Sequence, residues 1–198
     1  GPHLEFKAKT NFPEKIVHEL IAFANTDGGT LLIGINDDGN ICGVKYPEED
    51  EMLIKNALHK HCWPRIKIKS GIVKVSEKKW VVVFDVWGSK KKPIRFKQSG
   101  TKQVTYIRYQ DKTLQASPEA IEILRQKLGE KAVPFTYGEA ENKILKTLHE
   151  KKQATLPELK ILLNLTEPVL SNKLIHLAAA SVIGWKPQEP HDLFFTTR

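Results

Sequence analysis

Two pairs of residues in the stretch AFANTDGGTLLIGINDDG, residues 22–39, are of types that could do chemistry. Gly28-Gly29 could form a phosphate-binding loop, and Asp37-Asp38 could supply carboxylates to a metal ion. A P-loop has the pattern G-x-x-x-x-G-K-[ST], and no Lys-Ser/Thr pair follows a suitable glycine in this chain. A Rossmann G-x-G-x-x-G is also missing. We therefore expect the glycine pair to end a helix with a left-handed cap and to turn the chain into a strand.

The second pair, Asp37-Asp38, precedes Gly39 and allows two interpretations. Asp and Gly are favoured in tight turns for backbone reasons alone, which predicts the turn of a hairpin. Metal-assisted cleavage of a phosphodiester instead needs two or three converging carboxylates. Both interpretations stay open at this level. A cluster of His59, His61 and Cys62 lacks the spacing of a zinc site, so we expect no zinc there.

Positive charge is the most informative feature of the composition. The 198 residues carry 31 Lys and Arg against 23 Asp and Glu, which gives a net charge of +8 and a pI near 9.4. This balance favours a polyanionic partner, with nucleic acid ahead of a membrane surface. From Phe135 onward eight basic residues oppose seven acidic ones, so +7 of the charge lies on residues 1–134.

The segment SKKKPIRFK and the strand after it hold the cations that we expect to contact nucleic acid. These are Lys90, Lys91, Lys92, Arg95, Lys97 and Arg108. The alternative is that they only solvate strand edges, which keeps sheets from pairing with one another.

The elements that must position these residues form an α+β fold with a mixed sheet over residues 1–130. We expect a strand at 3–8, a helix capped by Asn11, a hairpin over 30–45 and a helix at 47–62. Four further strands and a helix that begins at Pro118 complete this domain. The stretch 129–138 is the predicted linker. No apolar run could span a membrane and no signal segment is present, and with two cysteines this predicts a cytoplasmic protein.

The sequence pattern of residues 138–198 predicts a small second domain of three helices and a hairpin, in the order of a winged helix-turn-helix. Thr155 and Thr166 are the expected caps of its second and third helices. The third helix would be the one that reads DNA. It offers Ser171, Asn172 and Lys173 near its start, which includes only one fixed cation.

Residues 3–45 resemble the Schlafen AlbA_2 family. The resemblance is carried by LEFK (4–7), AFANTDGGTLLIGINDDG (22–39) and ICGV (41–44), and it continues more loosely through KKPIRF and TYIRYQDKT to SPEAIEIL. It implies an α/β domain built around a sheet, with nucleic acid as the usual ligand. Bacterial members are mostly described as transcriptional regulators and often carry a C-terminal helix-turn-helix, which is consistent with residues 138–198.

Eukaryotic Schlafen proteins cut transfer and ribosomal RNA with a carboxylate triad and a divalent metal. On this chain the resemblance places the second acid at Glu5 and the third at Asp37, with Asp38 as its neighbour. The first acid would fall one position before Gly1, outside this chain. Lys7 is a further matching residue that could touch a phosphate. The resemblance thus implies Mg²⁺ or Mn²⁺ held by Glu5 and Asp37, if the protein is a nuclease.

Three functions follow as expectations. The leading one is a nucleic-acid-binding protein of the DNA-binding, transcriptional-regulator type, with a homodimer as one open arrangement. The alternative is a metal-dependent endoribonuclease that acts on structured RNA such as transfer RNA, with Glu5, Lys7, Asp37 and Asp38 at its catalytic site. The third is a non-catalytic adaptor that binds other proteins.

Overall fold

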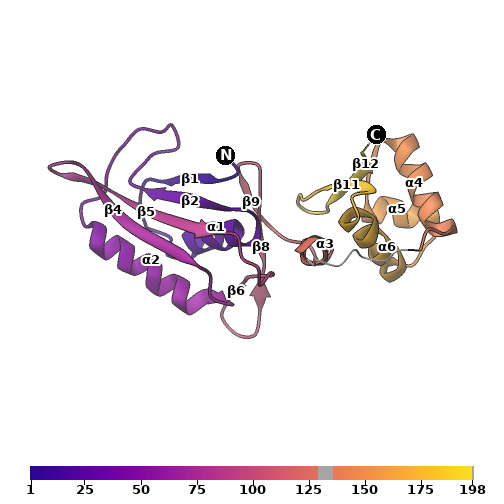
Figure 1. Cartoon of the computed structure of the whole chain (residues 1–198), viewed down its shortest axis with the longest axis horizontal. Helices are drawn as coiled ribbons and strands as arrows, with labels where there is room; N and C mark the ends of the chain where they lie inside the picture. The colour runs from indigo at the N-terminus through magenta and orange to yellow at the C-terminus, as the bar shows by residue number, and fades with distance from the viewer. Residues whose placement is uncertain (129–135, 198) are drawn as a thin grey trace. The chain divides into compact units, whose positions relative to one another are not determined.

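The computed structural model describes residues 1–128 and 136–197, and the chain divides into two compact units, Gly1–Gln115 and Ala116–Arg198 (Figure 1). This boundary lies earlier than the one near residue 130 that the sequence suggested. The helix α3 (Pro118–Leu128), which we expected to complete the first domain, packs on the helix α6 (Glu167–Ala179) of the second unit. Its residue Ile123 is fully buried in the core of that unit, so apolar packing assigns α3 there.

A mixed four-stranded sheet forms the centre of the first unit, with the strand order β1-β2-β5-β4. The strands are β1 (Leu4–Lys7), β2 (Gly28–Ile33), β4 (Ile68–Ser76) and β5 (Lys79–Trp87). β1 runs parallel to β2, whereas β5 is antiparallel to both β2 and β4. The alternation of apolar residues in KWVVVFDVW suits a strand with one face in the core, and Val82, Phe84 and Val86 are buried accordingly.

The helices α1 (Pro13–Asn25) and α2 (Pro47–His61) form the core of this unit together with the buried face of β2 and β5. The apolar positions of α1 recur at helical spacing, so that Val17, Leu20 and Ala24 are fully buried against the sheet. Pro13 occupies the first turn as expected. The N-cap residue, however, is Phe12 without a side-chain cap, so the expected cap at Asn11 is wrong.

The hairpin expected over residues 30–45 forms only over its inner part, because residues 28–33 of β2 already have strand neighbours on both sides. Ile35 bridges Ile41, the Asn36 N–H donates to the Asn40 carbonyl at 3.0 Å, and the Gly43 N–H donates to the Gly34 carbonyl at 2.8 Å. Val44 pairs instead with Trp80 at the start of β5.

Two smaller sheets complete the first unit. The strands β3 (Cys62–Trp63), β6 (Arg95–Lys97) and β7 (Gln103–Val104) form one of them. The strands β8 (Tyr106–Tyr109) and β9 (Lys112–Gln115) form the other. Asn25, at the end of α1, joins both sheets to the core. Its amide donates to the carbonyls of Ile94 and Tyr106 at 2.8 Å and accepts from the Ile94 N–H at 2.7 Å.

After α3, the second unit contains α4 (Glu139–Lys151), β10 (Gln153–Thr155), α5 (Leu156–Leu163), α6, β11 (Ile183–Lys186) and β12 (Leu193–Thr196). The strands pair in the order β10-β12-β11. Thr155 caps α5 as expected, and Glu158 accepts the Thr155 N–H at 2.8 Å. Thr166 is the N-cap residue of α6 but makes no side-chain cap. Within the described ranges, no helix is long and apolar enough to cross a membrane.

Candidate functional site

The residues that the sequence placed at a catalytic site begin on β1. Glu5 and Lys7 alternate along this strand with Leu4 and Phe6, and Glu5 lies beside Leu31 of β2, whose side chain is buried under the helices. Because alternate residues of a strand share a face, Glu5 and Lys7 point toward α1 and β8. There they meet Glu19 of α1 and Arg108 of β8.

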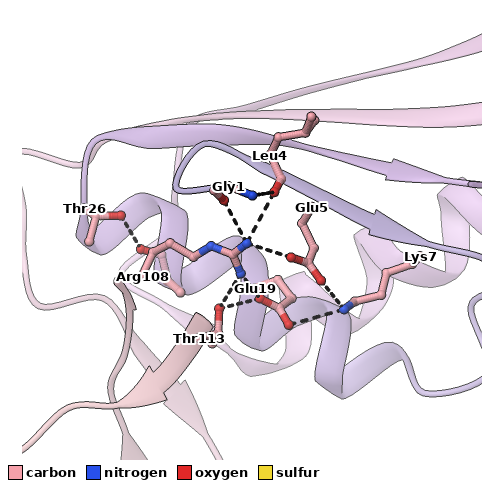
Figure 2. A network of polar contacts seen from close by, with 9 residues as sticks. Gly1, Leu4, Glu5, Lys7, Glu19, Thr26, Arg108 and Thr113 are labelled. Carbon is pink, nitrogen blue, oxygen red and sulfur yellow. Dashed lines mark hydrogen bonds and ion pairs between the residues drawn. The ribbon is translucent and has the colours of Figure 1, made fainter. Parts of the chain in front are cut away.

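Arg108 lies at the centre of this polar network (Figure 2). Its guanidinium donates to Glu5 Oε2 at 2.7 Å and to Glu19 Oε2 at 3.0 Å. It also donates to the carbonyls of Gly1 and Leu4 at 3.0 and 3.3 Å, and to Thr113 Oγ1 at 3.2 Å. Lys7 completes the network through ion pairs with Glu5 and with Glu19 Oε1, the second at 3.5 Å.

The network contains two carboxylates and two cations, and burial makes each charge depend on the others. Burial by itself would lower the pKa of Lys7, but hydrogen bonds and charge from Glu5 and Glu19 outweigh it and raise that pKa. The Arg108 side chain is only 2% exposed. It therefore cannot contact nucleic acid, and our expectation that it does is wrong. The alternation of a strand did not predict the burial of Arg108. Neighbouring residues of a strand normally point to opposite faces, but Ile107 and Arg108 are both buried.

The structure does not bring Asp37 and Asp38 into this network. They occupy the centre of an exposed turn in which the Gly39 N–H donates to the Asn36 carbonyl at 2.9 Å. Asp38 accepts the Asn40 N–H at 2.9 Å and the Asn40 amide at 2.7 Å. The Asn40 backbone N–H is the main cause that lowers the pKa of Asp38. Its carboxylate thus stabilises the turn.

The arrangement does not fit a divalent metal held by Glu5 and Asp37. Glu5 faces two cations, which compete with a metal for its oxygens. Among residues 1–128 and 136–197, no group of three or more His, Cys, Asp or Glu side chains could hold a metal ion. The nuclease hypothesis therefore gains no support from the geometry.

Backbone conformation and packing explain why glycine occupies positions 28 and 29, without any role in phosphate binding. Gly28 has φ +86°, and a Cβ there would lie 2.5 Å from the Val86 carbonyl oxygen. A Cβ at Gly29 would lie 2.6 Å from the ring of Phe23. The left-handed position is thus the first residue of β2, whereas Thr26 is the C-cap residue of α1.

Most of the expected nucleic-acid contacts of the first unit are exposed. Six exposed cations lie on β6 and on the segments that lead into β4 and β6, and we call them the basic edge: Arg65, Lys67, Lys90, Lys91, Arg95 and Lys97. None of the six forms an ion pair with a carboxylate in the described part of the chain. Cations without such partners remain available to phosphates.

Lys92 is a different case from its neighbours. Its ammonium donates to the Thr26 carbonyl at 2.7 Å, just past the C-terminal end of α1. Burial lowers the pKa of Lys92, and the charge of Asp27 offsets part of that effect. A lysine in this position satisfies a carbonyl at the helix end, so its main contact is structural.

In the second unit, two of the three residues expected to read DNA contact the protein itself. Ser171 donates to Glu119 of α3 at 2.6 Å. Lys173 forms an ion pair at 2.5 Å with Glu141 of α4, whose side chain is 4% exposed. Asn172 is exposed. The start of α6 thus has less free hydrogen-bonding capacity than its sequence suggested.

Three residues important to these sites were missed by sequence reasoning. Glu19 pairs with an arginine 89 positions away, and no spacing rule links such distant residues. Asn25 lies within the motif AFANT, but its partners are backbone groups of distant segments. Trp63 is 52% exposed, and its position two residues after the basic end of α2 was the available signal.

These features agree with known proteins at the level of family and fold. The family model "Schlafen, AlbA_2" matches residues 1–117, and the chain belongs to this family. No curated protein matches the chain.

Two solved structures are similar to this chain. One is the crystal structure of the DIP2311 protein from Corynebacterium diphtheriae, with a TM-score of 0.50 and 18% identity. That alignment covers 86% of this chain but 32% of DIP2311, so this chain spans about a third of that protein. The other is the solution structure of the N-terminal domain of a RecG-related protein from Nitrosomonas europaea. It has a TM-score of 0.39 and 23% identity, over 56% of this chain and 78% of that one.

Proposed function

We propose that the protein binds nucleic acid through the basic edge of its first unit and acts as a DNA-binding regulator. The observation that carries this proposal is the set of six exposed cations without carboxylate partners in the described residues. Such cations release counterions from phosphates, which supplies most of the sequence-independent affinity for nucleic acid.

The charge along α2 supports the same surface. Its first turn carries Glu48, Glu49 and Asp50, whereas its last turn carries His59, Lys60 and His61. α2 ends directly before β3, which pairs with β6 of the basic edge. Acids at one end and bases at the other direct a polyanion toward the end of the helix that borders the basic edge.

The second unit is, in this proposal, a winged helix that contributes to DNA binding. After α3, its order of helix, strand, helix, helix and two paired strands supports this assignment. The turn between α5 and α6 contains Asn164 with φ +51°, as a tight connection between helices requires. Because Ser171 and Lys173 are engaged within the unit, we assign the larger share of phosphate contact to the basic edge.

The test measures binding of the full chain to labelled duplex DNA and to transfer RNA at low salt. We expect binding that weakens as salt rises. If neither nucleic acid binds, the proposal fails, and the hypothesis of a non-catalytic adaptor that binds other proteins remains.

The same mixtures with Mn²⁺ test the nuclease alternative. We expect no cleavage by the wild-type chain, because Glu5 pairs with Arg108 and Lys7. Cleavage that is lost in Glu5→Gln and Asp37→Ala would restore the carboxylate assignment, and cleavage that persists in both would place any nuclease activity elsewhere.

A further inference from the structure

Two tryptophans at the basic edge are exposed to an extent that packing does not explain. Trp63 is 52% exposed and Trp87 is 44% exposed. The other two, Trp80 and Trp185, pack against the two hydrophobic cores. Burying an aromatic ring is among the largest favourable contributions that a side chain can make. A ring left in water beside cations therefore points to a partner that supplies the missing contact.

Each exposed ring is paired with a lysine of the basic edge. Lys97 Nζ lies 4.8 Å from the centre of the Trp63 ring, and Lys67 Nζ lies 5.0 Å from that of Trp87. The cations hold the rings in place through cation–π attraction. A base that stacks on either ring would also have its flanking phosphates close to an ammonium group.

The backbone keeps the two rings within reach of one short stretch of nucleic acid. Trp63 pairs with Arg95 between β3 and β6. The four Cα-to-Cα steps from Trp63 to Lys67 span at most about 14 Å, and the Trp87 N–H donates to the Lys67 carbonyl at 3.3 Å. The segment from Trp87 to Arg95 carries Lys90 and Lys91. Both chain segments that connect the surroundings of the two rings, residues 63–67 and 87–95, therefore carry cations.

This combination of chemistry selects unpaired over paired nucleic acid. In a duplex the faces of the bases are covered by their neighbours, so a protein ring has no base face on which to stack. In a single strand the bases can separate, and aromatic rings above a basic groove bind them with little sequence preference. We propose that Trp63 and Trp87 stack on bases of an unpaired DNA or RNA strand whose phosphates lie along the basic edge. The inference rests on the proposed function and names the form of nucleic acid that this edge binds.

The experiment compares the unaltered chain with the variant Trp63→Ala/Trp87→Ala. Labelled oligo(dT) and oligo(U) of about 15 nucleotides and a duplex of the same length are titrated at low salt. The matched control is Tyr46→Ala. Tyr46 is 54% exposed and lies beneath Lys45 at 5.1 Å, but it precedes α2, so the whole 15-residue helix, about 22 Å long, separates it from Trp63.

We expect the tryptophan variant to bind at least one of the single strands about tenfold or more weakly, since each stacked base contributes substantially. Duplex binding should change less than about twofold, and Tyr46→Ala should bind all three like the wild type. Comparing oligo(dT) with oligo(U) shows whether the strand is DNA or RNA. In the unaltered chain, tryptophan fluorescence should be quenched by that oligonucleotide, so the test does not depend on the variant alone.

The outcomes separate this inference from the function on which it rests. Unchanged single-strand affinity in the tryptophan variant, with nucleic acid still bound through Lys90 and Lys91, would overturn the stacking site and leave the proposed function intact. An equal loss for single strands and duplex would also overturn it. If no nucleic acid of either form binds at low salt, both proposals fail.

Discussion

Arg108 connects separate segments of the first unit at the scale of a single residue. One guanidinium reaches Glu5 on β1, Glu19 on α1 and Thr113 on β9 (Figure 2). It also lies over the Phe23 ring, 5.2 Å from the ring centre. A buried charge is tolerated only while its partners are in place, because desolvation costs several kcal/mol for each ion. The same residue therefore keeps two half-buried carboxylates compatible with folding.

Replacing Arg108 by Met should lower the free energy of unfolding of the first unit by about 3 kcal/mol or more, because Glu5 and Glu19 would lose their main cation. Urea unfolding followed by tryptophan fluorescence measures this, since Trp63, Trp80 and Trp87 all lie in that unit. The matched control is Lys55→Met, which lies in the same unit. Lys55 is 51% exposed and pairs with Glu51 at 2.7 Å, so this substitution should cost under about 1 kcal/mol. Equal costs for the two variants would show that the network contributes no more than an exposed pair.

Asp192 is a buried carboxylate in the second unit. It accepts from Ser117 Oγ at 2.5 Å and from the Gln188 N–H at 3.2 Å. Burial nevertheless dominates and raises its pKa above 3.8, with Glu119 adding to the rise. A raised pKa means that the carboxyl group stabilises the fold fully below the unfolded-state pKa. That contribution is lost as the pH rises through the folded-state pKa.

We therefore expect Asp192→Asn to stabilise the second unit at pH 7, because the amide keeps polar contacts without the buried charge. The advantage should shrink as the pH falls through the folded-state pKa and disappear near pH 3. Hydrogen exchange in α3, which Ser117 caps through the Ala120 N–H at 2.9 Å, provides the measurement. Slower exchange in the variant only at the higher pH is the expected result, whereas an advantage independent of pH would assign the effect to packing.

At the scale of elements, the turn from α1 into β2 depends on backbone geometry that only glycine provides. Gly28 has φ +86°, and its Cα faces the backbone of β5 and of Gly88. Gly39, in the Asp37-Asp38 turn, has nearly the same φ, +84°, but a Cβ there would meet nothing within 4 Å. The two positions thus share backbone strain and differ in available space.

This difference predicts unequal costs for the same substitution. Gly39→Ala should destabilise the protein by about 1–2 kcal/mol through left-handed strain alone. Gly28→Ala should cost about 1–3 kcal/mol more, because the Val86 carbonyl, which pairs β5 with β2, would have to move. Thermal unfolding of the two variants in parallel tests this. Similar unfolding temperatures for the two variants would mean that β5 moves aside without a loss of stability.

The sequence predicted elements better than it predicted their partners. The strand alternation in β4 and β5 and the helical spacing in α1 and α2 are local signals, and those elements formed as expected. The ICGV segment has the composition of a strand, but β2 had gained both neighbours through contacts distant in sequence. For the same reason only part of the polar network around Glu5 could be predicted from the sequence. The family motif singled out Glu5 and Lys7, whereas their partners Glu19 and Arg108 come from elements that only the folded chain brings together.

At the scale of the whole molecule, charge is divided unequally between the two units. Residues 116–198 carry eleven Lys and Arg against ten Asp and Glu, so +7 of the net +8 belongs to residues 1–115. Net charge affects encounter with a polyanion and the salt dependence of binding more than it affects the fold. The first unit should therefore dominate the electrostatic part of nucleic-acid affinity, whichever unit supplies sequence preference.

Two matched pairs of neighbouring exposed lysines test that division. Lys90→Glu/Lys91→Glu should weaken nucleic-acid binding and make the slope of log affinity against log salt shallower by about 2, since each lost phosphate contact removes about 0.9 from a duplex slope. Lys151→Glu/Lys152→Glu makes the same charge change in the second unit, where both side chains are also exposed. It should leave the slope nearly unchanged, because the charge of that unit is almost balanced. Titrations at three or more salt concentrations give both slopes, and a larger change for the Lys151 and Lys152 variant would move the main phosphate contacts to the second unit.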